Sequence, residues 1–443
     1  ILTLGAESGV RTINAVAENI GGITFTADSA NPIVIENQRP GDADYELVRI
    51  QYTETDIIGY ADATSVTAGD ILSLKVSMAQ PGDYSIDVYR FGYYAGAGAR
   101  LVTPTIGPLS GITQPDCQVT DPQTRLVECQ WNTSYALTIG NDWTSGLYMA
   151  RLWDVATGKQ YPIFFVVRDD NSTADIVFQS SLTTSLAYSN YGTPTEQYSL
   201  YGFNSTGGQR ALKVSFDRPV NELSYYSNVL RYEYNMIRWL ESQGYDVTYV
   251  TNLDVHENPA SLLQHKVFLS VGHDEYWSSE MRDGVEAARD AGVNLGFFSA
   301  NTAYWRVRFE PSSSGQPNRV MACYKDPFLD DPVAPTYLWR GLENSRPENA
   351  LMGVMYTGDW GDLYGGFDYV VSQSSDAYFN NTGLLNNDSL AALVGYEWDA
   401  VVDNGFSPPG LVILSESPVT PSNIGPMLPV GTDTSVSHSV KYI

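Results

Sequence analysis

The chain is poor in positive charge, in histidine and in cysteine, and each shortage argues against a class of function. Only 25 Lys and Arg residues stand against 51 Asp and Glu residues, which gives a formal net charge of −26. Such a surface repels nucleic acid and anionic membranes, so we expect neither as a partner. The four histidines argue against a zinc site with three histidine ligands and favour an oxygen-rich site.

Long apolar runs and the common catalytic signatures are also missing. No stretch of about 20 apolar residues exists, so we expect no membrane span. The sequence contains no Gly-x-Ser-x-Gly, no Walker loop, no Gly-x-Gly-x-x-Gly and no His-Glu-x-x-His. These motifs belong to serine hydrolases, to nucleotide-binding and dinucleotide-binding folds and to zinc peptidases. The candidate chemistry must therefore come from a less common combination of residues.

The three cysteines can form at most one disulfide within the chain. Cys117 and Cys129 bracket a loop that contains prolines, and Cys323 stands far from both. We expect a Cys117–Cys129 disulfide, with three unpaired thiols as the alternative. A disulfide favours an oxidising compartment, and the chain begins at Ile1 without a basic leader. We therefore expect a secreted or extracellular protein whose signal peptide has been removed.

Length and composition predict a folded protein with several domains. The chain has 443 residues, of which 43% are hydrophobic and 17% charged, which is too long for one typical core. Residues 1–35 carry short strand-like runs, at 1–4 and 23–26, without a core of their own. They are expected to dock on the next domain or to mediate self-association by strand addition. Residues 36–168 alternate apolar and polar positions in short runs, for example at 71–77 and 84–90, and predict an immunoglobulin-like β-sandwich.

From residue 174 to the end at 443 the periodicity changes to that of an α/β domain. Strand-like runs at 176–179, 247–250, 266–271 and 293–298 alternate with helical patterns at 229–242 and 278–291. Strand–helix–strand units of this length indicate parallel pairing. In an open α/β sheet, ligands bind outside the carboxyl ends of the strands.

The richest strand end is Val271-Gly272-His273-Asp274-Glu275-Tyr276-Trp277. His273, Asp274 and Glu275 could combine a metal ligand with a general acid or base. The alternative is structural, because acidic residues are favoured near the N-terminus of a following helix. His273 fits that alternative poorly, so we interpret the segment as a catalytic site.

Other polar residues follow the neighbouring strands. Asn301, just after the run at 293–298, could donate a hydrogen bond to a substrate oxygen or merely cap a turn. Tyrosines near strand ends or on a helix could ligate a hard ion such as Fe(III), although most of the 30 tyrosines are expected to be packing residues. The segment 254–257, Asp-Val-His-Glu, is either a set of metal ligands at the rim of the same cleft or a solvated loop.

Several of these segments together resemble the large subunit of N,N-dimethylformamidase. The resemblance rests on residues 245–249, 271–278, 292–295 and 299–305 and covers about 172–330. It implies an α/β domain similar to class I glutamine amidotransferases. It also implies a mononuclear iron held by two tyrosines and one glutamate, hydrolysis of a small-molecule amide and a separate small subunit as partner.

The resemblance assigns roles to individual residues. Glu275 would be the carboxylate ligand of Fe(III), His273 would carry protons beside it, and Asn301 would orient the substrate. The two phenolates would come from one residue of each of two pairs, Tyr188 or Tyr191 and Tyr234 or Tyr232. Two other functions stay open: a surface or filament-forming protein on the same fold, and a carbohydrate-active protein.

Overall fold

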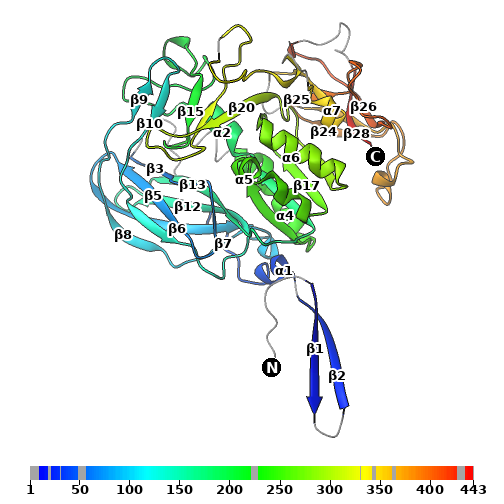
Figure 1. The fold of residues 1–443 in the computed structure, drawn as a ribbon, viewed down its shortest axis with the longest axis horizontal. Helices are drawn as coiled ribbons and strands as arrows, with labels where there is room; N and C mark the ends of the chain where they lie inside the picture. The colour runs from blue at the N-terminus through cyan, green and yellow to red at the C-terminus, as the bar shows by residue number, and fades with distance from the viewer. Residues whose placement is uncertain are drawn as a thin grey trace. The chain divides into compact units, whose positions relative to one another are not determined.

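The architecture is taken from a computed structural model, which describes residues 9–17, 21–29, 31–47, 56–220, 228–329, 331–341, 346–361, 366–426 and 435–442. Of residues 9–29 and 435–438 only the backbone is described. Contacts divide the chain into two compact units. The first comprises residues 1–271, 283–296 and 309–321, and the second comprises 272–282, 297–308 and 322–443. Strands outnumber helices in the described residues, which combine β and α/β content as predicted (Figure 1).

The first unit begins with a hairpin and a short helix. Strand β1 (Gly9–Ala17) pairs antiparallel with β2 (Gly21–Ser29), from Gly9 opposite Ser29 to Ala17 opposite Gly21. Helix α1 (Pro32–Glu36) follows, with the Asn31 side chain accepting the Ile33 N–H as an N-cap. The pattern at 23–26 correctly predicts a strand, but it gives no sign of the helix at the end of the 1–35 segment. The predicted run at residues 1–4 lies outside the described residues.

Two mainly antiparallel sheets follow in the first unit, with alternating apolar residues buried between them; strand β4 runs parallel to its neighbour, β13. Gly59 lies where they face each other, since a Cβ at this position would be 3.0 Å from side-chain carbons of Leu152 and Ile163. One sheet has the order β11-β5-β3, and the other has β4-β13-β12-β6-β7 with β8 on β6. Their bounds are β3 Ile57–Ala61, β4 Ser65–Thr67, β5 Ile71–Met78, β6 Gly82–Phe91, β7 Ala99–Leu101, β8 Ile106–Gly111, β11 Tyr135–Thr138, β12 Gly146–Asp154 and β13 Gln160–Arg168. A separate hairpin joins β9 (Gln118–Asp121) to β10 (Leu126–Glu128), and a 3-10 turn, η1, spans Tyr94–Gly96.

The predicted parallel sheet is also present, in the order β16-β14-β17-β19. Strand β14 pairs in parallel with both β16 and β17, because Ile176 stands opposite Val247 on one side and Val267 on the other. The elements of this part are β14 Ile176–Ser180, α2 Leu182–Tyr188, η2 Thr206–Gly208, β15 Lys213–Ser215, the π-helix η3 Val229–Glu233, α4 Tyr234–Ser242, β16 Val247–Thr251, α5 Asn252–Glu257, η4 Pro259–Gln264, β17 Val267–Val271, α6 Ser279–Asp290, β19 Asn294–Phe298 and β21 Val320–Ala322.

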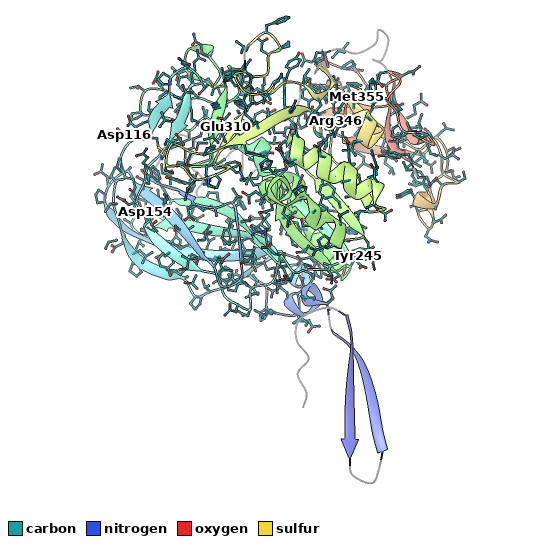
Figure 2. All side chains as sticks on the ribbon, in the orientation of Figure 1. Asp116, Asp154, Tyr245, Glu310, Arg346 and Met355 are labelled. Carbon is teal, nitrogen blue, oxygen red and sulfur yellow. A yellow bond between two sulfur atoms is a disulfide. The ribbon has the colours of Figure 1, made fainter. Side chains whose placement is uncertain are left out.

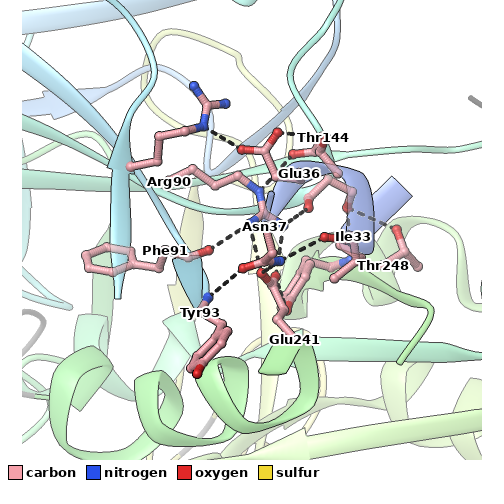
Figure 3. A network of polar contacts seen from close by, with 12 residues as sticks. Ile33, Glu36, Asn37, Arg90, Phe91, Tyr93, Thr144, Glu241 and Thr248 are labelled. Carbon is pink, nitrogen blue, oxygen red and sulfur yellow. Dashed lines mark hydrogen bonds and ion pairs between the residues drawn. The ribbon is translucent and has the colours of Figure 1, made fainter. Parts of the chain in front are cut away.

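A buried polar network joins α1, the sandwich and α4 within the first unit (Figure 3). The guanidinium of Arg90 on β6 binds both carboxylate oxygens of Glu241 on α4, at 2.8 and 3.0 Å. Asn37 donates to Glu241 at 2.8 Å and accepts the N–H groups of Tyr93 and Tyr94. Because Arg90 and Glu241 have no exposed side-chain surface, their charges depend on each other for compensation.

The second unit is mainly β. Strand β18 (Tyr276–Ser278) pairs in parallel with β20 (Trp305–Glu310), with Tyr276 opposite Trp305. The helix predicted at 278–291 is present as α6, Ser279–Asp290, directly after β18. Tyr276 and Trp277 are fully buried and form a short strand first, because pairing with β20 satisfies their backbone. The remaining elements are η5 Trp339–Gly341, α7 Asn349–Met352, β22 Met355–Asp359, β23 Phe367–Val370, η6 Ala377–Phe379, β24 Ser389–Val394, β25 Glu397–Ala400, β26 Val412–Pro418, β27 Asn423–Ile424 and β28 Ser435–Lys441.

The division predicted from the sequence, 1–35, 36–168 and 174–443, stays a prediction. Cys117 and Cys129 form a disulfide in the structure, with their Cα atoms 4.2 Å apart. Cys323 is a buried thiol outside that bond. Among the described residues, no helix is long and apolar enough to cross a membrane. The side chains that the structure describes are drawn in Figure 2.

Candidate functional site

A turn at Gly272 leads into the His-Asp-Glu segment at the start of the second unit. Gly272 has a φ of 87°, which L side chains rarely adopt. Its N–H donates to the Phe298 carbonyl at 3.3 Å, and its own carbonyl accepts the Ser299 hydroxyl. The end of one predicted strand is therefore bound to the end of the next.

The loop after Phe298 lies directly against this turn. The N–H of Ala303 donates to the Asp274 carbonyl, and the N–H groups of Tyr304 and Trp305 donate to the Glu275 carbonyl, at 2.8 to 2.9 Å. Asp274 is fully buried, and its backbone holds the loop. The sequence correctly placed the His273 segment and the Asn301 loop beside each other.

His273 lies between two carboxylates. Its Nε2 is 2.6 Å from Glu275 Oε1 and 3.3 Å from Glu397 Oε2. Glu275 is buried, with 1% of its side chain exposed, whereas His273 and Glu397 keep 11% and 17%. A proton carrier with a buried partner on one side and a partly accessible carboxylate on the other can exchange protons with a bound molecule.

The pKa values in this trio are shifted by burial and by the neighbouring charges. Burial alone would lower the pKa of His273, but the adjacent Glu275 and Glu397 carboxylates raise it well above its usual value. Burial raises the pKa of Glu397, an effect that His273 opposes and that Glu275 and Asp359 reinforce. Shifts of this kind, caused by burial and specific charge partners, are typical of functional sites.

Asn301 is held by a second buried carboxylate. Its backbone has a φ of 59°, and its N–H donates to Asp399 Oδ1 at 2.6 Å. The side-chain oxygen of Asn301 is buried and has no hydrogen-bond partner. Burial raises the pKa of Asp399 to about 7, opposed by the hydrogen bond from Asn301 and reinforced by Glu348. The alternative of a turn residue explains the positive φ but not the unsatisfied amide oxygen.

A buried ion pair between Arg340 and Glu348 belongs to the same unit and contacts Tyr304. Arg340 binds Glu348 through Nε and Nη2, at 2.9 to 3.1 Å, and donates to the Tyr356 carbonyl at 2.9 Å. The guanidinium also lies 5.2 Å from the centre of the Tyr304 ring. Burial raises the pKa values of Tyr304 and Tyr356, so both phenols stay protonated at neutral pH.

Sequence reasoning missed Glu397 and Asp399. Both come from the region beyond residue 310, where the sequence pattern predicts only loops and strands that complete the domain. A signal was present in Glu397-Trp398-Asp399, because alternate residues of a strand share one face. Two carboxylates on one face of β25, on either side of a buried Trp398, are unusual for simple packing.

The four tyrosines predicted as iron ligands belong to the first unit, whereas Glu275 belongs to the second. Each has a contact of its own there. The Tyr234 hydroxyl lies 2.6 Å from that of Tyr45. The Tyr191 carbonyl accepts from Arg218 at 2.6 Å, and burial raises the pKa of the Tyr191 phenol to about 12. The ring of Tyr188 stacks on Tyr201 at 4.2 Å, and that of Tyr232 lies 5.3 Å from the Arg231 guanidinium. In the described part of the chain, no group of three or more His, Cys, Asp or Glu residues could hold a metal ion. The Tyr–Glu ligand set stays a prediction.

Two structural interpretations need correction. Residues 254–257 are neither a metal site nor a solvated loop, because they lie in helix α5. There Asp254 forms a capping box with Thr251 and an ion pair with Arg168 at 2.9 Å. Asp274 and Glu275 do not favour a helix dipole, because α6 begins at Ser279 and its first-turn acid is Glu280.

Comparison with known proteins identifies the family. A model of the family described as "N,N-dimethylformamidase beta subunit-like, C-terminal" matches residues 85–443. The chain belongs to this family. The resemblance seen in the sequence is confirmed, and it extends over more of the chain than the expected residues 172–330.

Two relatives within this N,N-dimethylformamidase-like family have curated names. The N,N-dimethylformamidase beta subunit of an Alcaligenes species is 24% identical over 221 residues, and that of Paracoccus aminophilus is 23% identical. Each match covers 42% of this chain and 29% of the relative, so the chain spans less than a third of the curated relatives. A family 123 glycoside hydrolase from Clostridium perfringens aligns with a TM-score of 0.12 and 10% identity, over 60% of this chain and 48% of that one, which carries no argument.

Proposed function

We propose that the chain is a hydrolase of C–N bonds in small amides, in which His273 passes a proton from Glu397 to the leaving nitrogen and Glu275 stabilises the charged imidazole. The observation behind this proposal is the trio itself, in which one imidazole nitrogen contacts two carboxylates. Family membership supports the reaction class. The relatives are named as subunits of N,N-dimethylformamidase, and the proposal extends amide hydrolysis from those proteins to this chain.

Glu397, His273 and Asn301 can carry out the hydrolysis in a short series of proton transfers. Glu397, the more accessible carboxylate, takes a proton from water as its oxygen attacks the amide carbonyl carbon. The amide of Asn301, held through its backbone by Asp399, donates a hydrogen bond to the oxygen that gains charge. His273 gives its proton to the leaving nitrogen as the C–N bond breaks. Glu397 then returns the proton from water to His273, and a carboxylic acid and an amine leave.

The test is release of dimethylamine from N,N-dimethylformamide and of ammonia from formamide and acetamide. We expect the unaltered chain to hydrolyse at least one of them. His273→Gln and Glu397→Gln should each lower kcat/KM by about 100-fold or more, the usual contribution of a general acid or base. Glu416→Gln, which removes an exposed carboxylate of β26, should stay within about twofold of the unaltered rate. No release from any of the three amides, or equal rates in all the variants, would overturn the proposal.

Ferric iron remains part of the proposal, supported by the resemblance alone. The resemblance implies Glu275 and two tyrosines as its ligands, and the iron would polarise the amide carbonyl. None of the proton transfers above depends on it. A visible charge-transfer band together with about one iron per chain is the expected result. A colourless protein that resists iron loading would remove the metal from the proposal.

We also propose the fold types of the two main parts of the chain and a location outside the cytoplasm. Two facing sheets support an immunoglobulin-like sandwich. The parallel order β16-β14-β17-β19 supports a fold like that of class I glutamine amidotransferases. The Cys117–Cys129 bond supports secretion. Fractionation of the native cells should place the protein outside the cytoplasm, and recovery only from the cytoplasm would contradict secretion.

A further inference from the structure

The first unit contains a pocket that the proposed function does not use. It lies between β3 and β13 of the sandwich and residues 216–220 and encloses about 400 Å³ of empty space, open solvent at its mouth included. Aromatic rings form much of its wall, from Tyr60, Tyr161, Phe164 and Phe216. An apolar lining with a few polar groups of this kind is typical of sites for small molecules.

The charge of this pocket is opposite to that of the chain. Two arginines, Arg218 and Arg319, line it, and no acidic residue does, although the chain carries a net charge of −26. Arg319 is compensated, because its Nε binds Asp217 at 2.9 Å and its Nη2 donates to two carbonyls. One positive charge is therefore left over, at Arg218.

Arg218 has no counter-charge among the described residues. It is 1% exposed and donates to the backbone carbonyls of Ser189, Tyr191 and Tyr198, at 2.6 to 3.0 Å. Its Nε is buried without a hydrogen-bond partner. Burial lowers the pKa of Arg218 to about 10, which still leaves the guanidinium charged at neutral pH.

Other buried arginines of the chain show what is missing here. Arg90 is paired with Glu241 and Arg340 with Glu348. In each pair, two guanidinium nitrogens bind both carboxylate oxygens. A buried charge without a partner costs several kcal/mol, and carbonyl dipoles compensate it only partly. The carbonyl bonds explain why Arg218 holds the loop at 189–198, but they leave its net charge beside an open apolar space.

We propose that this pocket binds a small organic monoanion, a carboxylate with an apolar chain or ring. Its charge would compensate Arg218, and its apolar part would lie against Tyr60, Tyr161 and Phe216. The pocket has one uncompensated positive charge, which matches a monoanion better than a phosphate with two charges. Binding here is independent of the proposed hydrolysis.

The test is calorimetric titration of the full chain with hexanoate and benzoate, each beside its neutral alcohol, 1-hexanol or benzyl alcohol. We expect at least one carboxylate to bind saturably and at least tenfold more tightly than its alcohol. Arg218→Gln should remove that preference. Ala63→Leu narrows the pocket at a half-buried lining position and should weaken binding at least tenfold, whereas Ala156→Leu in an exposed turn should not.

Every outcome either supports or overturns the proposal. Because Arg218→Gln could unfold the loop that it holds, thermal unfolding is measured on every variant, and binding to Ala63→Leu is decisive if Arg218→Gln does not fold. The proposal is overturned if neither carboxylate binds, if a carboxylate and its alcohol bind equally, or if a folded Ala63→Leu binds as well as Ala156→Leu. The proposal is judged on binding constants alone, with thermal unfolding as the control for folding. Failure of the amide assays would therefore leave the binding result unaffected.

Discussion

At the scale of single residues, the second unit contains many carboxylates and few cations. Glu275, Glu397, Asp399 and Glu348 are all buried or nearly so, and their counter-charges are His273, Arg340 and Arg282. Four acids with three cations cannot all stay ionised at low cost. Asp399 shows the consequence, since burial raises its pKa to about 7.

Asp399 should therefore make the protein less stable as the pH rises from about 4 to about 7. In that range the folded chain keeps a proton on Asp399 that the unfolded chain has lost, so unfolding becomes easier with increasing pH. The full effect corresponds to ~4 kcal/mol, for a rise from about 4 to about 7. Denaturant unfolding at fixed pH values should show that Asp399→Asn reduces this decline. Parallel curves for both proteins would mean that Asp399 is ionised at neutral pH.

At the scale of elements, segments distant in sequence are held together by buried ion pairs. Helix α1, the sandwich strand β6 and helix α4 meet at Arg90 and Glu241, 151 positions apart. Neither residue stands out in the sequence, because one lies in an alternating strand and the other on a helix. A double hydrogen bond of this kind sets the relative positions of the two elements and also stabilises their contact.

Removing one partner of this pair should cost far more than removing an exposed one. We expect Glu241→Gln to lower the free energy of unfolding by about 3 kcal/mol or more, because Arg90 would stay buried without compensation. Asp170→Asn, which breaks the exposed pair with Arg168, should change it by less than about 1 kcal/mol. Equal losses in the two variants, measured by urea unfolding, would show that the buried pair has no special weight.

The Cys117–Cys129 bond can be tested at the same scale. It closes a loop with a sequence separation of 12, and its loss should cost roughly 3 kcal/mol in the chain-entropy model. The double variant Cys117→Ser/Cys129→Ser should therefore unfold at lower urea concentration, whereas Cys323→Ala should not share this effect. A thiol assay in denaturant should find one thiol per chain, and three would contradict the bond.

At the scale of the whole molecule, the net charge of −26 dominates the behaviour in solution. Like charges repel each other in the compact state, and salt screens this repulsion over about 10 Å at 0.1 M. We therefore expect the unfolding temperature to rise by several degrees between low salt and about 0.5 M NaCl at pH 8. The rise should shrink near pH 4.3, the isoelectric point. An unfolding temperature independent of salt would mean that the charges are already locally balanced.

The sequence alone determined the local elements, because their signals are local. Alternation predicted β5 and β6, helical spacing predicted α4, and apolar runs predicted β14, β16 and β17. The strand-end rule also brought His273 and Asn301 together, since parallel strands end at one edge of a sheet. It failed at residues 254–257, where a capping box looked like a set of metal ligands.

Only the tertiary structure decided which charges meet. Glu397 approaches His273 from 124 positions away, and Asp399 holds the Asn301 backbone from 98 positions away. Similarly, nothing in the residues around Arg218 shows that it lacks a carboxylate. Periodicity reports which face of an element is buried, but the partner across that face is set by chain topology. In this protein, long-range pairing of buried charges determines the shifted pKa values and hence the chemistry that we propose.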